Sequence, residues 1–345
     1  MPINKFTSEI PVLLLFNLDM NWSKREQEEV INISSQLGKG IDASGHQTTL
    51  IPVSGEELEI ILSDYDPYRN IVFNFCESIP GLYHSEWLVA EYLEQHGFTF
   101  TGSTSATLAL AQEKCRMKQL FNEAGIPTPR WQKYDSDSMI RWDGFPAIVK
   151  PSEEHCSEGI DRNAVVMTKS ELKNRIRYIL KEFRQPALVE DFIDGRELHV
   201  SLWGNGRIDM LPPAEMEFSL FHGVQDRICS YEAKFVPESK QYQDIKTVLP
   251  APLSEEEYSE VERVCRAAYR IAGCRDYARV DMRMRDGELY VIDVNPNSDI
   301  SPDTSTISAA ELLGYSYGEF GSRIISLALH RHPAWRNHVH AGIYP

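Results

Sequence analysis

The first hundred residues alternate between short apolar runs and longer amphipathic segments. Buried strands are predicted at three apolar runs, residues 12–17, 48–53 and 71–75. Helices are predicted over the amphipathic segments between and after them, residues 24–37, 56–62 and 86–95. The first of these helices is expected to end near Gly38. Strands that alternate with helices over short links are typical of a parallel sheet covered by helices. The pattern therefore predicts an α/β module at the start of the chain.

A change of pattern near residue 126 predicts a module boundary. Residues 105–124 have the apolar spacing of a single helix, which Gly125 would close. Pro127 and Pro129 follow, and neither residue can continue a helix. We therefore expect the first module to span residues 1–126.

The rest of the chain predicts two α+β modules, at residues 127–202 and 203–345. The central one would hold a helix at residues 170–183, with Ser170 as its N-cap. Its strands are expected at residues 147–150, 164–167, 187–192 and 197–203. The C-terminal module would hold a long polar loop, a helix and a hairpin, at residues 221–248, 254–272 and 277–295.

Composition excludes several classes of partner. The 345 residues carry 35 Lys and Arg against 51 Asp and Glu, a formal charge of −16, which repels nucleic acid and anionic lipid. No apolar run approaches the ~18 residues needed to span a bilayer, and the chain begins without a signal-peptide pattern. Six scattered cysteines without a C-x-x-C pair indicate free thiols in a reducing compartment. We therefore expect a cytoplasmic protein with no nucleic-acid or membrane partner.

Common enzyme signatures are absent from the sequence. It contains no P-loop, no G-x-G-x-x-G fingerprint, no H-E-x-x-H and no G-x-S-x-G. Any phosphate in this protein is therefore bound by something other than a P-loop.

The hairpin at residues 277–295 has two possible turns. A two-residue turn at Asp286 and Gly287 would place Asp293 on an apolar face and Asp281 on the other, so each face would mix charge with apolar groups. A three-residue loop at residues 285–287 would instead separate them, because a shift of one residue exchanges the faces. One face would then gather Arg279, Asp281, Arg283, Asp293 and Asn295, with Leu289 and Val291. We favour the three-residue loop, because ionised carboxylates in an apolar layer cost several kcal/mol.

The charged face of this hairpin is a candidate metal site. Asp281, Asp293 and Asn295 would converge there as oxygen ligands, which suit a hard cation such as Mg²⁺. Arg279 beside them would stabilise negative charge that develops during a reaction. The alternative is a solvated face with cross-strand ion pairs, which is common in charged hairpins.

From about Asn70 to Ala328 the chain resembles the ATP-grasp ligases, and among them the D-alanine:D-alanine ligase type. The matching stretches occur in the order of that family, at residues 101–103, 113–114, 148–152, 189–192, 195–197, 231–234, 279–281 and 293–295. The resemblance implies an ATP-grasp fold in which ATP lies between the central and C-terminal modules. It also implies Mg²⁺ as a cofactor, with Mn²⁺ as a substitute.

The resemblance implies a role for individual residues. Lys114 and Lys150 would reach the ATP phosphates, together with the loop of Ser157 and Gly159. Glu190 would accept the adenine amino group, beside the backbone of Phe192 and Ile193, and Glu197 would bind the ribose. Lys234 would close over the γ-phosphate, and Arg279 would stabilise the transferring phosphoryl group. Asp281, Asp293 and Asn295 fall on the magnesium ligands, and substrate contacts are expected from Glu77, Asp299, Ser301, Thr304 and Ser305.

Four departures from the family pattern affect substrate recognition. The phosphate-covering loop reads His155, Cys156 and Ser157, where the family has Gly and two Ser. Phe235, which follows Lys234, replaces the Tyr that the family has at this position. Pro296 and Asn297 replace the glycine after the metal-binding asparagine. The Gly-rich N-terminal loop that positions the first amino acid is absent. ATP binding would be retained while both ends of the substrate site differ.

These features predict an ATP- and Mg²⁺-dependent ligase that phosphorylates an oxygen of a small-molecule acceptor and couples an amino acid through its amine. One fitting subfamily adds an amino acid to mycosporine-glycine. The alternatives are a D-alanine:D-alanine or other dipeptide ligase, and an ATP-binding scaffold without turnover. The resemblance also implies a homodimer.

Overall fold

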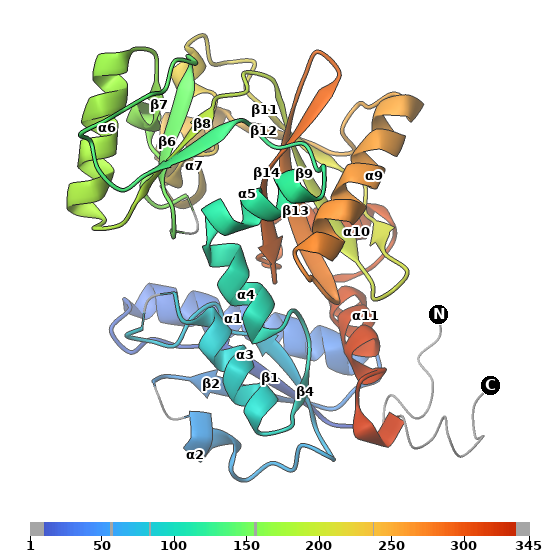
Figure 1. Cartoon of the computed structure of the whole chain (residues 1–345). Coiled ribbons are helices and arrows are strands. Elements are labelled where there is room, and N and C mark those ends of the chain that lie inside the picture. Colours follow the sequence, from blue (N-terminus) through green and yellow to red (C-terminus); the bar gives the residue numbers. More distant parts are fainter. Residues whose placement is uncertain (1–9, 56–57, 83, 155–156, 237, 336–345) are drawn as a thin grey trace.

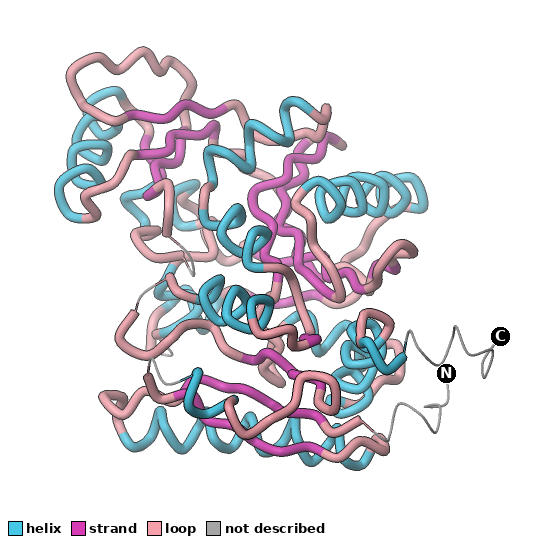
Figure 2. The backbone as a smooth tube through the Cα atoms, turned by 60° about the horizontal axis from the view of Figure 1, so that its bottom comes forward, coloured by secondary structure: helices cyan, strands magenta, loops and turns pink. Residues whose placement is uncertain are grey.

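The computed structural model describes residues 10–55, 58–82, 84–154, 157–236 and 238–335. These residues form three sheets, each packed against its own helices (Figures 1 and 2). Among the described residues, none of the helices is long and apolar enough to cross a membrane.

The first sheet is parallel, as the alternating pattern predicted. Its strand order is β2-β1-β3-β4, and the strands are β1 (Val12–Asn17), β2 (Thr48–Val53), β3 (Ile71–Phe75) and β4 (Thr99–Phe100). Every residue of β1 is buried, as expected of a strand covered by helices on both faces. The helices of the first module are α1 (Lys24–Ala43), α2 (Leu58–Leu62) and α3 (Glu86–Gln95).

Helix α1 does not end near Gly38, because it continues to Ala43. Close packing explains the glycines inside it. A Cβ atom at Gly40 would lie 2.7 Å from the Cα atom of Gly318 in α11 (Tyr317–Leu329). The two glycines therefore let α1 and α11 approach closely, a tertiary contact that outweighs low helix propensity.

The predicted single helix at residues 105–124 is two helices, α4 (Ser105–Gln112) and α5 (Lys114–Glu123). The helix breaks at Glu113, whose ψ angle is 74°. The amide of Lys114 donates to the carbonyl of Ser152, 3.2 Å away in the central module, instead of to its own helix. The break therefore connects the start of α5 to the central module.

The central module has a four-stranded antiparallel sheet in the order β5-β8-β6-β7. Its strands are β5 (Trp131–Tyr134), β6 (Ala147–Pro151), β7 (Val165–Val166) and β8 (Ala187–Asp191), and a 3₁₀ turn precedes β7 at Arg162–Ala164. Helix α6 (Lys169–Glu182) covers it, and its N-cap is Thr168, which accepts from the amide of Glu171, rather than Ser170.

The third sheet contains one strand that was expected in the central module. β9 (Arg196–Trp203) pairs with β11 and β13, so the change of module falls between β8 and β9 rather than after residue 202. The sheet order is β12-β11-β9-β13-β14, with β10 beside β9. The other strands are β10 (Asp209–Met210), β11 (Ala214–Glu217), β12 (Lys246–Val248), β13 (Tyr277–Arg285) and β14 (Glu288–Pro296).

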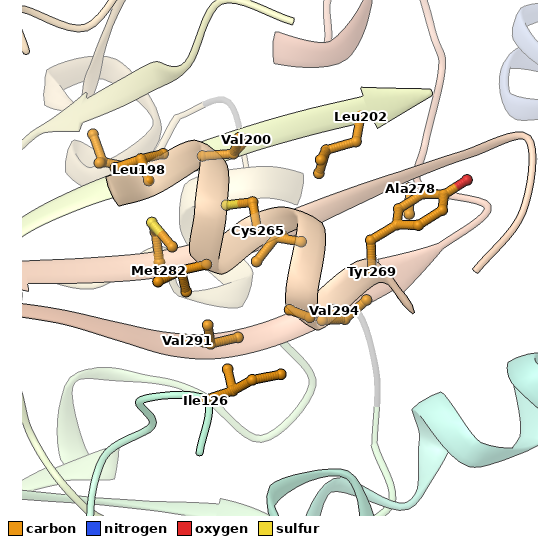
Figure 3. Close-up of a cluster of buried hydrophobic side chains, with 14 of the residues drawn as sticks. Ile126, Leu198, Val200, Leu202, Cys265, Tyr269, Ala278, Met282, Val291 and Val294 are labelled. Atoms are coloured by element: carbon orange, nitrogen blue, oxygen red, sulfur yellow. The ribbon is translucent and has the colours of Figure 1, made fainter. Parts of the chain in front are cut away.

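Helix α9 (Glu255–Ile271) packs on one face of this third sheet. Figure 3 shows Cys265 of α9 near Val200 and Met282, and Tyr269 of α9 near Ala278. The opposite face of the sheet is thereby left for the polar residues of β9, β13 and β14.

Residues 221–248 are more ordered than the predicted loop. They contain a 3₁₀ turn, two short helices and an edge strand, at Val224–Asp226, α7 (Tyr231–Phe235), α8 (Lys240–Asp244) and β12. Ser230 and Ser239 cap the two helices by accepting from the amides of Ala233 and Tyr242. Serine caps that were not noticed in the sequence therefore give this segment its local structure.

The hairpin turn has two residues, so the predicted three-residue loop is wrong. Asp286 and Gly287 both have positive φ angles, 53° and 80°, as a type I′ turn requires. Leu289 and Val291 consequently lie on the buried apolar face, opposite to the prediction.

The predicted separation of charged side chains nevertheless occurs, by means of a β-bulge. Val291 pairs with Met282, whereas Asp293 pairs with Asp281, so Ile292 has no partner in the ladder. The extra residue shifts the register by one and returns Asp293 to the polar face.

The C-terminal segment completes the first module. Helices α10 (Ser305–Leu312) and α11 contribute Ile307, Phe320 and Ile324 to the core that contains Val12 and Leu14 of β1. Segments three hundred residues apart in the sequence thus share one hydrophobic core.

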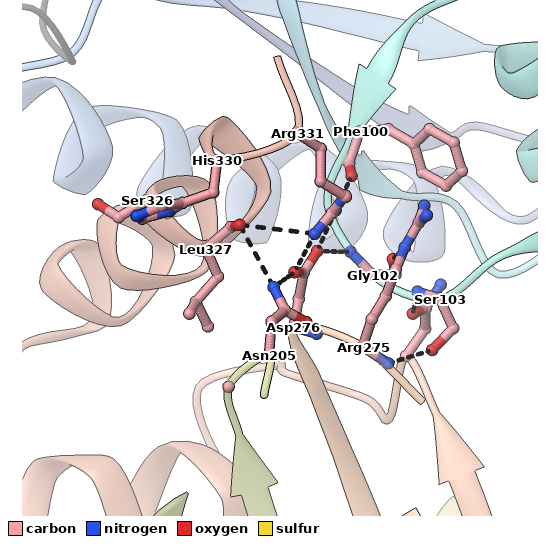
Figure 4. Close-up of polar contacts among 12 residues, drawn as sticks. Phe100, Gly102, Ser103, Asn205, Arg275, Asp276, Ser326, Leu327, His330 and Arg331 are labelled. Carbon is pink, nitrogen blue, oxygen red and sulfur yellow. Dashed lines mark hydrogen bonds and ion pairs between the residues drawn. The ribbon is translucent and has the colours of Figure 1, made fainter. Parts of the chain in front are cut away.

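A buried aspartate connects the first module to the third sheet (Figure 4). Asp276 is fully buried and accepts from the amide of Gly102 at 2.8 Å and from Asn205 at 2.8 Å. Arg331 donates to both of its carboxylate oxygens at 2.7 Å, and to the carbonyl of Phe100 at 2.8 Å. This network fixes the loop before α4 against the start of β13.

Candidate active site

Residues of all three modules line one cleft with a volume of about 660 Å³. Sixteen of the residues predicted to form the site contribute to its lining: Glu77, Lys114, Lys150, Ser157, Glu190, Phe192, Ile193, Glu197, Lys234, Arg279, Asp281, Asp293, Asn295, Asp299, Thr304 and Ser305. The structure therefore brings together residues that are more than two hundred positions apart. Gly159 and Ser301, both predicted for the site, lie outside this lining.

Gly159 and Ser301 have local structural contacts. Gly159 has a φ angle of 69°, and a Cβ atom there would lie 2.7 Å from Pro151. The carbonyl of Ser301 accepts from the hydroxyl of Thr304 at 2.8 Å. Both residues thus shape loops beside the cleft.

A buried cluster of charged side chains lies at the end of the cleft that is lined by the central module. Glu190 is 1% exposed, and its two carboxylate oxygens pair with Lys118 and Lys150. Burial favours the neutral form of Glu190, but the two ammonium groups outweigh it and hold its pKa below the ordinary value. Burial lowers the pKa of Lys118, which is 2% exposed. Lys150, expected at the phosphates, is here an ion-pair partner of Glu190.

Lys118 was missed in the sequence. It lies four residues after Lys114 on α5, so both side chains project from one side of that helix. Lys114 is buried as well, and it donates to the carbonyl of Glu154. The i, i+4 spacing of two lysines on a helix with buried apolar neighbours was the available signal.

Five apolar side chains from the central and C-terminal modules line the cleft. They are Ile148, Phe192, Met216, Ile228 and Ile292. Apolar side chains with a carboxylate among the lining residues fit a purine ring, and the lysines fit a polyphosphate. The residues present therefore fit ATP.

The polar face of the hairpin carries the predicted metal ligands. Arg279 donates to both oxygens of Asp281 at 2.6 and 2.9 Å, and the Asn295 amide donates to Asp281 at 2.9 Å. Burial opposes ionisation of Asp281, but Arg279 outweighs it and holds the pKa of Asp281 well below its ordinary value. Asp293 pairs with Asp281 across the two strands. Two carboxylates and an amide oxygen on one face fit a hard divalent cation such as Mg²⁺.

Glu197 lies one strand away, on β9. Arg283 contacts its carboxylate at 2.5 Å and His199 at 3.4 Å. Burial favours the neutral carboxyl, but Arg283 and His199 lower the pKa of Glu197 to about 2. Glu197 is therefore an anion at neutral pH, available to accept from hydroxyl groups.

The opposite end of the cleft, next to the first module, is acidic. It holds Glu77, Glu86 and Asp299. The pKa of Glu77 is raised to about 7, mainly by burial and to a smaller extent by repulsion from Asp299. The Glu77 side chain nevertheless reaches water in the cleft. Burial, followed by repulsion from Glu77, raises the pKa of Glu86 well above its ordinary value.

Asp299 does not cap the following helix. Its Oδ1 accepts from the amide of Ser301 at 2.8 Å, whereas the N-cap of α10 is Thr304. Glu86 was missed in the sequence, whereas Asn297 was noted only as a departure from the family pattern. Asn297 accepts from the amide of Ser103 at 2.7 Å and has a φ angle of 54°. It occupies the region where the family glycine is replaced.

The structure describes only part of the two segments that were predicted to cover the phosphates, the loop around Ser157 and the segment of Lys234. Lys234 lies in α7, is exposed and lines the cleft. Ser157 has a φ angle of 60° and donates to the carbonyl of Cys229 at 2.9 Å. His155, Cys156 and the side chain of Phe235 lie outside the described residues. The five described cysteines are free thiols, in line with the prediction.

Comparison with known proteins identifies the family. The model of the D-ala D-ala ligase C-terminus matches residues 120–326. The chain belongs to the D-alanine–D-alanine ligase family. An uncharacterized protein y4sG of Sinorhizobium fredii is 32% identical over 267 residues, 76% of this chain and 75% of that protein. A D-alanine–D-alanine ligase of a Marinomonas strain is 28% identical over 310 residues, 87% of this chain and 90% of that one.

Solved structures of this family share the fold. The D-alanine–D-alanine ligase of Bacillus anthracis, complexed with ATP, superposes with a TM-score of 0.73 at 20% identity, covering 94% of this chain and 99% of that one. The predicted ATP-grasp fold is thereby confirmed. As a member of the D-alanine–D-alanine ligase family, the chain is an ATP-dependent, ADP-forming carbon–nitrogen ligase.

Proposed function

We propose that this ligase phosphorylates an oxygen of a small-molecule acceptor and joins to it the amine of an amino acid. The observation that carries the proposal is the shared cleft. Lys114 and Lys234 line the same space as Arg279 and the other residues of the polar face of the hairpin. Phosphoryl transfer depends mainly on positioning and on electrostatic stabilisation of the transferring group. Cations together with metal-binding oxygens supply both.

The residues of the chain take complementary parts in this proposal. Lys114 and Lys234 hold the phosphates, whereas Lys150 pairs with Glu190. Asp281, Asp293 and Asn295 hold Mg²⁺, which neutralises phosphate charge when bound. Arg279 stabilises the charge on the transferring phosphoryl group. Glu190, with Phe192 and Ile193, binds the adenine, and Glu197 accepts from the ribose. An ATP-binding scaffold would not need Arg279, so its position on the metal face favours turnover.

The acidic end of the cleft supports recognition of the amine. Glu77 and Asp299 lie where the two substrates would meet the metal face, and Thr304 and Ser305 add hydroxyl groups. Carboxylates attract an ammonium group and repel a second anion. The site therefore favours an amino substrate with little negative charge at this end.

A second candidate is a D-alanine–D-alanine ligase. It is favoured by relatives of that name in Marinomonas and Cupriavidus pinatubonensis, whose matches cover 90% and 92% of their lengths. The departures at the substrate end, including Asn297 in the left-handed region, favour a different acceptor. We therefore propose an acceptor of the mycosporine-glycine type as the specific compound to test.

Release of ADP tests the proposal. Purified protein is given ATP, Mg²⁺, one amino acid and one candidate acceptor, which is D-alanine, another amino acid or mycosporine-glycine. Arg279→Ala is the inactive control. We expect ADP release that needs both partners of a pair. Release with D-alanine alone would favour the second candidate, and no release with any pair would contradict turnover. The homodimer stays a prediction.

A further inference from the structure

A carboxylate, an imidazole and a thiol converge on the wall of the cleft beside the proposed ribose position. Glu197, His199 and Cys229 each offer one ligand atom, and these atoms all lie within 4.8 Å of one another. Glu197 and His199 are two residues apart on β9, so their side chains lie on the same face of the sheet. Cys229 comes from the segment before α7. All three are half-buried and line the cleft.

Neighbouring groups already orient this cluster. Arg283 donates to the carbonyls of Gly195 at 3.1 Å and Arg227 at 2.7 Å, and it pairs with Oε2 of Glu197. The other oxygen, Oε1, lies 3.4 Å from Nε2 of His199. One carboxylate oxygen is therefore held by the protein while the other faces the cluster.

The segment that carries Cys229 is also anchored. Its carbonyl accepts from the Ser157 hydroxyl at 2.9 Å, and Ser230 caps α7. Groups that orient metal ligands in this way raise metal affinity. The Glu197 carboxylate thus has a hydrogen-bonded partner of the kind that metal sites use, and the backbone of Cys229 is fixed.

We propose that Glu197, His199 and Cys229 bind a borderline-soft divalent cation of the Zn²⁺ class, with a fourth position open to the cleft. Sulfur, imidazole nitrogen and carboxylate oxygen are the ligands of Zn²⁺, whereas Mg²⁺ prefers oxygen alone. The oxygen donors on β13 and β14 form a different site with a different preference. On binding, the Cys229 thiol loses its proton to solvent and the thiolate bonds to the cation.

The site has a consequence for the nucleotide. Under the proposed function Glu197 accepts from the ribose, so a cation on Glu197 and a bound nucleotide exclude each other. Only this competition rests on the proposed function. Binding of the cation depends on the three ligands alone.

Titration with Co²⁺, as a spectroscopic substitute for Zn²⁺, tests the site directly. Excess Mg²⁺ is kept present to fill the oxygen site. We expect one equivalent of Co²⁺ to produce the near-ultraviolet charge-transfer band of a cobalt–thiolate bond. The band should disappear in Cys229→Ser and persist in the matched control Cys115→Ser, since Cys115 lies outside the cluster and the cleft lining.

A second variant keeps the test decisive if Cys229→Ser fails to fold. His199→Gln should retain the band but weaken Co²⁺ binding by more than about tenfold, since even residues that only orient ligands contribute that much. No band in the intact protein, or an unchanged band in folded Cys229→Ser, would overturn the site.

Competition separates the two proposals. A non-hydrolysable ATP analogue should weaken Co²⁺ binding to the intact protein. If the thiolate band forms with unaltered affinity in the presence of bound analogue, the metal site stands and the ribose role of Glu197 is wrong.

Discussion

Asp281 and Asp293 are direct partners across the hairpin because Ile292 is left out of the pairing. Without the bulge, the two-residue turn would place Asp293 opposite Val280 in the buried layer. One unpaired residue thus decides whether two carboxylates meet on the polar face.

Asp293→Asn should lower ADP formation by orders of magnitude, because the substitution removes the charge that binds the cation while keeping the shape. Thermal unfolding should change little. The matched control is Asp286→Asn in the exposed turn, where asparagine also tolerates a positive φ angle. Wild-type turnover of Asp293→Asn at saturating Mg²⁺ would show that the metal assignment is wrong.

Glu190→Gln should destabilise the protein by about 3–5 kcal/mol, because it leaves Lys118 and Lys150 buried without their shared anion. Urea unfolding followed by tryptophan fluorescence measures the change. Glu182→Gln serves as the control, since its pair with Lys181 is exposed and contributes little to stability. Equal stability of the two variants would contradict a structural role for the buried cluster.

Raising the pH from 6 to 8 should lower the KM for the amino substrate. The pKa of Glu77 is raised to about 7 by burial and Asp299, so the attracting negative charge forms over this range. Glu77→Gln should remove this dependence on pH.

The raised pKa of Glu77 also predicts the direction in which the stability of the protein changes with pH. The folded state binds the Glu77 proton more tightly than the unfolded state, whose pKa is near 4.5. The contribution of Glu77 to stability is therefore present below pH 4.5 and is lost as the pH rises toward 7. Thermal melting of the intact protein and of Glu77→Gln across this range checks the direction.

Lys234→Ala should reduce turnover far more than nucleotide affinity, because the lysine acts on the closed state of the segment at residues 221–248. Lys240→Ala in α8 is the matched control, since Lys240 is exposed and outside the cleft lining. Protease cleavage within this segment should slow with ATP and Mg²⁺. An equal rate with and without nucleotide would argue against closure.

Asp299→Ala should raise the KM for the amino substrate while that for ATP stays within a few-fold. Asp299→Asn separates charge from local structure, because its amide oxygen can still accept from Ser301. Recovery in the asparagine variant would assign Asp299 to the turn alone.

Periodicity predicted the α/β first module and the charged hairpin face, because both depend on residues close together in the chain. The bulge at Ile292 carries no glycine signal, so the correct face was expected for the wrong reason. The ion pair of Lys118 with Glu190 forms only through packing between modules. Such contacts leave no spacing to recognise in a single sequence, which also hid the assignment of β9 to the third sheet.

The core shared by β1 and α11 has a consequence for how the chain assembles. The ribosome makes Val12 and Leu14 about three hundred residues before their partners Phe320 and Ile324. The opening sheet must therefore wait with one face uncovered while the two later modules are made. The module that contains β1 is completed only after the two modules that follow it in the chain have been made.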